Sequence, residues 1–261
     1  MIRRSVLVIA AAVIAGTTVL AQQQQTASLP SFEVASVKPN KTVEQAVGLV
    51  GGQPGGVTFK NLVLRDLIRR SYRLQEFQVL GGPSWIDSER FDVLARTRGT
   101  PSINDKWAMM RTLLADRFAL RVHTETRNTL VYRLVRARKD GKLGPQMRKS
   151  PSPCVAQMPC AVLGISRSGE LSARTDPMND FVHRGLMFLL SVPVIDETHL
   201  DGIFDIDLKW TPDASFVAGA GDDSRPSIFT ALREQLGLKL EPMRGPAEFL
   251  VIDHIERPTP D

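Results

Sequence analysis

The sequence predicts an α+β fold, a tandem duplication of helix-plus-strand units with helices packed on antiparallel or mixed sheets. Three observations lead to this prediction. Strand-type alternation of apolar residues gives way to helix-type spacing several times along the chain. Four segments of the first half recur in the same order in the second half. The 261 residues, 43% of them hydrophobic, suit one or two globular domains rather than a disordered chain.

Residues 1–21 have the pattern of a secretory signal peptide. Arg3 and Arg4 precede an apolar run from Val6 to Ala15, and small residues follow it. An uncleaved membrane anchor is the alternative, but the run is shorter than the roughly 20 residues that a membrane-spanning helix needs. We therefore expect a secreted or periplasmic protein with no membrane span after cleavage.

The charge of the chain argues against nucleic acid as a partner. Its 33 Lys and Arg against 28 Asp and Glu give a formal charge of +5, and two of the arginines belong to the signal peptide. The remaining excess is too small to attract a polyanion by itself.

Residues 22–55 contain a predicted N-terminal strand and a loop. The strand is the alternating stretch SFEVASVKP, which Pro39 ends, and the loop contains GGQPGG. A glycine-rich loop alone is weak evidence for phosphate binding, and the GK[ST] ending of a P-loop is missing.

The first α+β half covers residues 56–139. Residues around Val57 alternate as in a strand, and apolar residues from Leu64 onward follow at helical spacing. A second strand is expected around Phe91–Ala95, followed by a helix for which Asn104 is the predicted N-cap. The stretch FALRVHTETRNTLVYRLVRARK closes this half as a predicted hairpin with a polar turn.

Residues 140–169 form a predicted connector rich in Pro, Gly and Ser. It contains Cys154 and Cys160, which an oxidising compartment allows to form a disulfide that closes a short loop. A redox or metal-binding pair is the alternative, but the spacing is not CxxC and no histidine is near in the sequence.

The second half, residues 170–261, repeats the plan of the first. GVTFKNLVLRDLIRR (56–70) aligns with ELSARTDPMNDFVHR (170–184), and ERFDVLA aligns with GIFDIDL. The helix through Leu114 and Phe118 aligns with SIFTALREQLG at an offset of 118 residues, and LVYRLVR aligns with LVIDHIE at 120. We expect the halves to fold alike, with a ligand or partner surface in the groove between them.

Asp205, Asp207 and His254 are the best catalytic candidates, although no acid–base constellation stands out. Asp205 and Asp207 share one strand face, a spacing that suits glycoside hydrolysis or calcium, but such residues also commonly pair with nearby lysines. His254 follows Asp253 directly in a strand, so the two side chains point to opposite faces and do not form a dyad. No metal site is predicted, because the histidines are scattered singly: His123, His183, His199 and His254.

A row of arginines on the first predicted helix is the best candidate for a binding surface. Arg65, Arg69 and Arg70 lie on the side of this helix opposite its apolar residues, and Trp85 follows in the next turn region. Such a row can bind an anionic partner, and the alternative is a solvated helix face. We would test these four residues first.

Several stretches resemble a known family: VIDETHLDGIFDIDLKWTPD, LREQLGLKLEPMRGPAEFLVIDHIERP, FEVASVKPN, GGPSW and RFALRVHTET. The chain is similar over nearly all of its mature length to a paralogue-rich family of secreted proteins from soil bacteria, a domain of unknown function. The resemblance carries over no catalytic residues. A related domain attached to membrane sensor-peptidases would imply an envelope sensing or binding role, but this chain departs from that pattern in having no peptidase part.

These observations favour a non-catalytic binding or scaffolding module of the cell envelope, with an envelope protein or a glycan as partner and no cofactor. Two alternatives remain open. One is a hydrolase acting on a cell-wall or polysaccharide substrate through Asp205, Asp207 and His254. The other is an accessory protein of an envelope sensor system.

Overall fold

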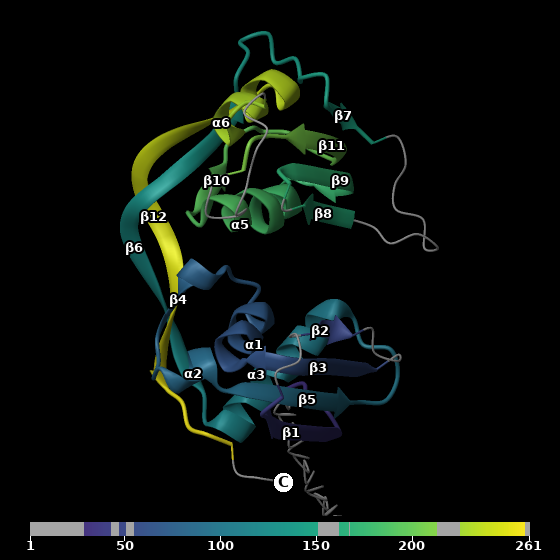
Figure 1. Ribbon diagram of the computed structural model, residues 1–261, viewed down its shortest axis with the longest axis vertical. Coiled ribbons are helices and arrows are strands. Elements are labelled where there is room, and N and C mark those ends of the chain that lie inside the picture. The colour runs from purple at the N-terminus through teal and green to yellow at the C-terminus, as the bar shows by residue number, and fades with distance from the viewer. Residues whose placement is uncertain are drawn as a thin grey trace, which may run out of the picture.

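The computed structural model describes residues 29–42, 47–50, 55–150, 162–166, 168–212 and 225–258. These residues form two lobes joined along one side by a long two-stranded ribbon (Figure 1). The predicted signal peptide and both cysteines, Cys154 and Cys160, lie outside the described residues. Within the described ranges, no helix is long and apolar enough to cross a membrane.

The first lobe is an antiparallel sheet of order β1-β5-β3-β2, with helices on one face. Its strands are β1 (Val34–Asn40), β2 (Val47–Val50), β3 (Gly56–Val63) and β5 (Arg90–Arg96). Its other elements are α1 (Leu64–Ser71), η1 (Glu76–Gln78), β4 (Val79–Gly81), α2 (Trp85–Ser88) and α3 (Ile103–Phe118).

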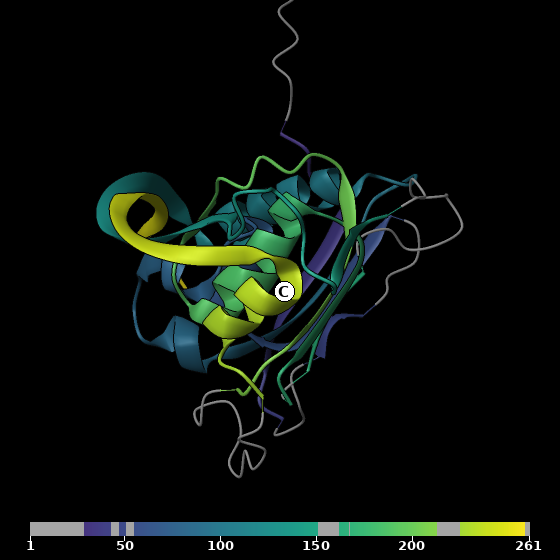
Figure 2. The same ribbon diagram turned by 90° about the horizontal axis from the view of Figure 1, so that it is seen from above.

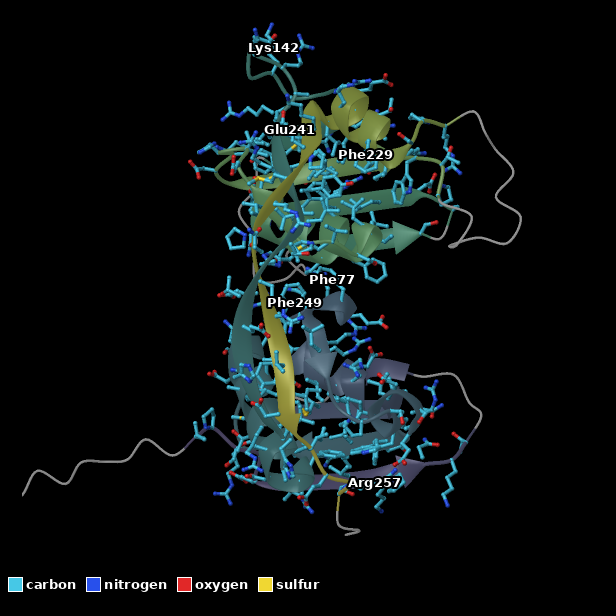
Figure 3. The ribbon with its side chains drawn as sticks, turned by 90° about the vertical axis from the view of Figure 1, so that its left-hand side faces the viewer. Phe77, Lys142, Phe229, Glu241, Phe249 and Arg257 are labelled. Carbon is cyan, nitrogen blue, oxygen red and sulfur yellow. The ribbon has the colours of Figure 1, made fainter. Side chains whose placement is uncertain are left out.

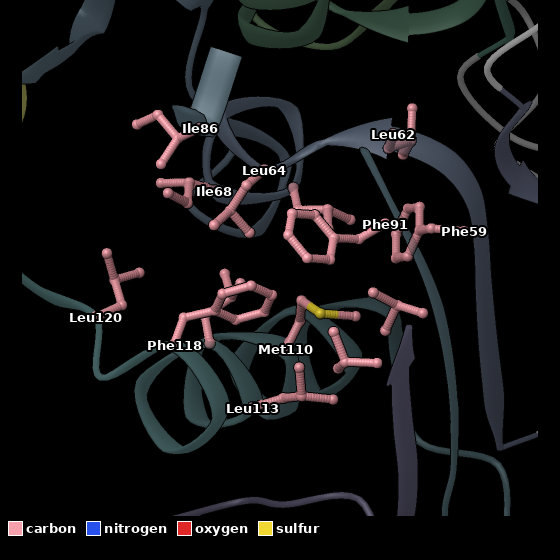
Figure 4. Close-up of a cluster of buried hydrophobic side chains, with 14 of the residues drawn as sticks. Phe59, Leu62, Leu64, Ile68, Ile86, Phe91, Met110, Leu113, Phe118 and Leu120 are labelled. Carbon is pink, nitrogen blue, oxygen red and sulfur yellow. The ribbon is translucent and has the colours of Figure 1, made fainter. Parts of the chain in front are cut away.

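Alternation along β5 sets the core of this lobe, because Phe91, Val93 and Ala95 are buried while the residues between them are not. Figure 4 shows side chains from β3, β5, α1 and α3 filling the space between sheet and helices. The rings of Phe91 and Phe118 meet edge to face, with centroids 5.3 Å apart.

The second lobe has an antiparallel sheet of order β7-β11-β9-β8. Its strands are β7 (Met147–Lys149), β8 (Val162–Ser166), β9 (Glu170–Pro177) and β11 (Ile203–Lys209). Its other elements are α4 (Met178–Asp180), η2 (Phe181–Leu186), α5 (Met187–Leu190), β10 (Val194–Asp196), α6 (Ile228–Ala231) and η3 (Leu232–Leu236).

The ribbon consists of β6 (Arg121–Arg136) and β12 (Leu238–His254), which pair antiparallel along almost their whole length. β6 leaves the first lobe and pairs in parallel with β10 of the second, while β12 leaves the second lobe and pairs in parallel with β4 of the first. Seen from above, the helices lie between the ribbon and the small sheets (Figure 2). Each lobe is therefore completed by a strand that starts in the other.

Buried side chains follow this exchange. Leu134 of β6 belongs to the second hydrophobic core, and Leu250 and Ile252 of β12 belong to the first. Phe77, which precedes β4, packs against the second core at the level where the lobes meet (Figure 3). The lobes are thus tied together by shared cores as well as by backbone hydrogen bonds.

The predicted α+β class with antiparallel and mixed sheets is confirmed, but two local predictions are wrong. Residues 121–136 form one continuous strand rather than a hairpin, because the polar residues from Thr124 to Asn128 pair with β12 instead of turning. Helix α3 is capped by Ser102 rather than Asn104. The Ser102 Oγ accepts from the Asp105 N–H at 3.2 Å, and the Asp105 carboxylate accepts from the Ser102 N–H at 3.1 Å.

The two lobes have the same strand order, with β7, β8, β9 and β11 at the places of β1, β2, β3 and β5. Residues 22–55 and the connector 140–169 both contribute strands to these sheets. Tyr132 pairs with Val194, the first residue of β10, and Leu250 pairs with Val79, the first residue of β4. Tyr132 and Leu250 therefore have corresponding positions. The ribbon strands are offset by 118 residues, and the predicted offset of 120 residues is wrong. Descent from one copied segment stays a prediction.

Candidate functional site

Arg65, the first of the predicted binding residues, is held inside the first lobe. Its guanidinium pairs with the Asp87 carboxylate and donates to the carbonyl oxygens of Val79 and Gly81, both at 3.0 Å. These bonds tie α1 to β4 and α2. A partner that bound Arg65 would have to compete with all of them.

The other three predicted binding residues are also partly buried or in contact with other side chains of the chain. Arg69 pairs with Asp66 one turn earlier, and burial together with the neighbouring Arg69 lowers the pKa of Arg70. Trp85 is half-buried, with the Arg257 guanidinium 4.9 Å from its ring centroid. The four residues lie near one another on α1 and α2 but do not form an open basic surface.

The three catalytic candidates are not brought together. Asp205 accepts from Arg148 at 3.2 Å, and Asp207 accepts from both Arg174 at 2.7 Å and Ser172 at 3.1 Å. His254 lies at the far end of β12, beside the first lobe, and its Nε2 lies 2.8 Å from the Glu256 carboxylate.

Asp253 and His254 point apart, in agreement with strand alternation. The Asp253 carboxylate lies 2.8 Å from Nδ1 of His123 on the neighbouring strand β6. Among the described residues, no three His, Cys, Asp or Glu side chains gather in a way that could hold a metal ion.

The structure instead contains a cavity of about 810 Å³ in the second lobe. Its walls come from β6, β8, α5, the end of β11 and the start of α6. The lining residues are Tyr132, Ile165, Ser166, Phe188, Leu189, Leu190, Val192, Trp210, Thr211, Pro212, Ser227, Ile228 and Phe229. The sequence analysis did not identify this site.

The cavity lies at the start of the α6–η3 helix, which has the place of α3 in the second lobe. α3 and the α6–η3 helix both end in a left-handed residue, Ala119 at φ 48° and Gly237 at φ 71°. Counted back from these ends, α3 has 16 residues, whereas α6 and η3 have 4 and 5. The second helix thus starts at Ile228, about two turns later.

The sheet of the second lobe also has a smaller side chain at one buried position. In the first lobe Trp107 of α3 packs on Phe59 of β3, with ring centroids 6.3 Å apart. The β9 residue at the place of Phe59 is Ala173, since Phe59 pairs with Val93 and Ala173 pairs with Ile206 at the same step of their strands. The predicted alignment of the halves already paired Phe59 with Ala173.

The described lining carries no formal charge at neutral pH, because it contains no Asp, Glu, Lys, Arg or His. The rings of Tyr132 and Phe229 lie 5.6 Å apart at 56°. Phe188 and Phe229 are 47% and 43% exposed, so part of the aromatic lining faces solvent. Figure 3 shows Phe229 in the upper lobe, beside the ribbon.

A second unpredicted feature of this lobe is a buried carboxyl group. Asp176 at the end of β9 is 0% exposed, and neither of its oxygens has a hydrogen-bond partner among the described residues. Burial, helped by the charge of Asp180 and opposed by that of Arg184, raises the pKa of Asp176 to about 6. Leu62 has the corresponding place in the first lobe, because Leu62 pairs with Phe91 as Asp176 pairs with Phe204.

Fold and site together define a two-lobed α+β protein with exchanged ribbon strands and, in one lobe, a cavity whose described lining is aromatic and uncharged. A family model described as a protein of unknown function, DUF3738, matches residues 65–255, and the chain belongs to this family. The matched range runs from α1 to the end of β12 and includes every residue that lines the cavity. No curated protein and no solved structure matches the chain.

Proposed function

We propose that this chain is an exported, non-catalytic binding protein of the cell envelope whose ligand site is the cavity of the second lobe. The observation that carries the proposal is the cavity itself. Its volume of about 810 Å³ falls in the range of roughly 300–1,000 Å³ that is usual for small-molecule sites. Such sites are lined mainly by apolar and aromatic side chains with few polar groups, as here.

The chemistry of the lining favours binding over catalysis. General acid–base catalysis needs a group that can exchange a proton near neutral pH within hydrogen-bond reach of the substrate. The described lining contains no Asp, Glu, His, Lys or Cys side chain that could serve as such a group. Because Asp205, Asp207 and His254 each have an ion-pair partner and lie outside the cavity, we do not propose a hydrolase.

Export is supported by the leader sequence at residues 1–21, with its paired arginines and apolar run. Apolar small molecules partition to the membrane surface, where an envelope protein with an apolar cavity could bind them.

The test is the binding of the neutral fluorescent probe N-phenyl-1-naphthylamine to the mature chain. We expect its emission to rise with saturation at one site, and we expect Ile165→Trp, which fills the cavity from β8, to abolish the rise. Leu94→Trp is the matched control, because Leu94 is an exposed aliphatic residue on a strand of the first lobe. If Ile165→Trp binds the probe as the wild type does, and circular dichroism shows both variants to be folded, the cavity is not the ligand site.

A further inference from the structure

The charge of the cavity restricts what it can hold. An ion that leaves water for an apolar site loses its hydration, and it stays there only if a counter-charge or several hydrogen bonds replace the lost water. The described lining offers no charged side chain of either sign. An uncharged molecule meets no such penalty.

The aromatic groups restrict its shape. Tyr132, Phe188, Trp210 and Phe229 reach the cavity from four different elements. Ring systems gain stabilisation from offset or edge-to-face contacts with such side chains, beyond the burial of their apolar surface. The inclined arrangement of Tyr132 and Phe229 leaves their faces and edges able to make these contacts.

The hydrogen bonds already formed in the lining show which polar groups remain. Three hydroxyl groups are engaged within the protein. Ser166 bonds to the Ser168 hydroxyl, Thr211 donates to the Arg225 carbonyl, and Ser227 accepts from the Thr230 N–H at 3.3 Å as the cap of α6.

Two polar groups of the lining have no hydrogen-bond partner within the part of the chain that the structure describes. They are the Tyr132 hydroxyl and the indole N–H of Trp210. The indole N–H can only donate, and the phenol can donate or accept. A ligand that satisfies both must present a hydrogen-bond acceptor.

We infer that the cavity binds an uncharged, ring-containing molecule that carries a carbonyl, ester or amide acceptor, held by Tyr132 and Trp210. This inference rests on the proposed function, because it specifies the ligand of the same site. The aromatic walls take the rings, and the two unpartnered groups replace the water that the acceptor gives up.

Three naphthalenes of similar size test it by isothermal titration calorimetry on the mature protein. 2-Acetylnaphthalene has the acceptor, 2-ethylnaphthalene lacks it, and 2-naphthoate adds a negative charge. We expect 2-acetylnaphthalene to bind about tenfold more tightly than 2-ethylnaphthalene, which is the range of one or two net hydrogen bonds. We expect 2-naphthoate to bind more weakly than either.

Two variants locate the hydrogen bonds. Tyr132→Phe and Trp210→Phe each remove a polar group and keep a ring, so each should lower the preference for 2-acetylnaphthalene over 2-ethylnaphthalene by about threefold. Trp107→Phe is the control, because Trp107 lies on α3 of the first lobe, where it packs on Phe59.

The outcomes separate the two proposals. Equal binding of all three naphthalenes, or tighter binding of 2-naphthoate, overturns the ligand class and leaves the binding function standing. The proposed ligand class is also wrong if none of the three naphthalenes binds while N-phenyl-1-naphthylamine does. If that probe fails as well, the binding function fails and the inference falls with it.

Discussion

The two lobes have the same strand order and differ in how the space between sheet and helices is filled. In the first lobe the long helix α3 covers the sheet to its end, and Trp107 packs on Phe59. In the second lobe the matching helix starts at Ile228, about two turns later, Ala173 has the place of Phe59, and a cavity lies at the start of that helix. Two lobes with the same strand order can therefore have a closed core or a cavity, depending on a few side chains and on where the covering helix starts.

The same contrast is visible in the core itself. Leu62 in the first lobe contributes to a continuous apolar core, whereas Asp176 in the second places an unpartnered carboxyl group at the corresponding position. Buried, unpaired carboxyl groups destabilise a fold. At this position the second lobe therefore has a destabilising group that the first lobe does not have.

The largest expected effect comes from the exchange of strands. Leu134→Ala should lower the free energy of unfolding by about 3 kcal/mol, because it leaves a cavity in a fully buried site. Although β6 starts in the first lobe, amide hydrogen exchange should rise most in β9 and β11 of the second lobe, whose core Leu134 joins. A rise confined to β3 and β5 would contradict the exchanged arrangement.

The next effect concerns the buried carboxyl group. The native state holds the Asp176 proton more tightly than the unfolded chain, since its pKa is raised from 3.8 to about 6. The contribution of this group to stability is therefore present at low pH and is lost as pH rises through about 6, by on the order of 2 kcal/mol.

Asp176→Leu copies the first lobe and should remove this loss. Denaturant unfolding at pH 4 and pH 7.5 should show the variant more stable than the wild type by about 2 kcal/mol at pH 7.5, and by less at pH 4. The reverse change Leu62→Asp, which introduces the carboxyl group into the first lobe, should destabilise at pH 7.5. An equal gain for Asp176→Leu at both pH values would show that the Asp176 proton is not involved.

The smallest effect compares the two helix caps. Ser102 forms a reciprocal box with Asp105, whereas Ser227 accepts from the Thr230 N–H with no acidic side chain to return the bond. Ser102→Ala should cost about 1 kcal/mol of stability and Ser227→Ala somewhat less. Thermal unfolding followed by circular dichroism measures both, and a larger loss for Ser227→Ala would reverse the expected order.

Local patterns were sufficient for much of the fold. The alternation through Phe91, Val93 and Ala95 predicted β5, and the spacing through Leu114 and Phe118 predicted α3. The hairpin prediction failed because the stretch around Thr124–Asn128 has the polarity of a turn. Its partner in β12 lies more than a hundred residues away, and no local pattern indicates it.

The candidate site was harder to predict, because a cavity is a space between side chains and leaves no motif in the sequence. Trp210 and Phe229 belong to no motif that marks a binding site in the sequence, and only the folded structure brings them to one cavity. Arg65 read as a free cation, but the turn before α2 brings Asp87 and two carbonyl groups to it. Most of the charged residues that the sequence singled out are held in ion pairs, and the described lining of the cavity carries no charged side chain.

The crossing of β6 and β12 has a consequence for the order in which the molecule is completed. Leu250 and Ile252 close the first core, yet they follow the other buried residues of that core by more than a hundred positions in the chain. A chain interrupted anywhere before β12 leaves its earliest-made part with apolar surface open to water. Neither lobe can therefore finish folding before the other. Truncation within β12 should give an aggregation-prone chain rather than a smaller folded domain.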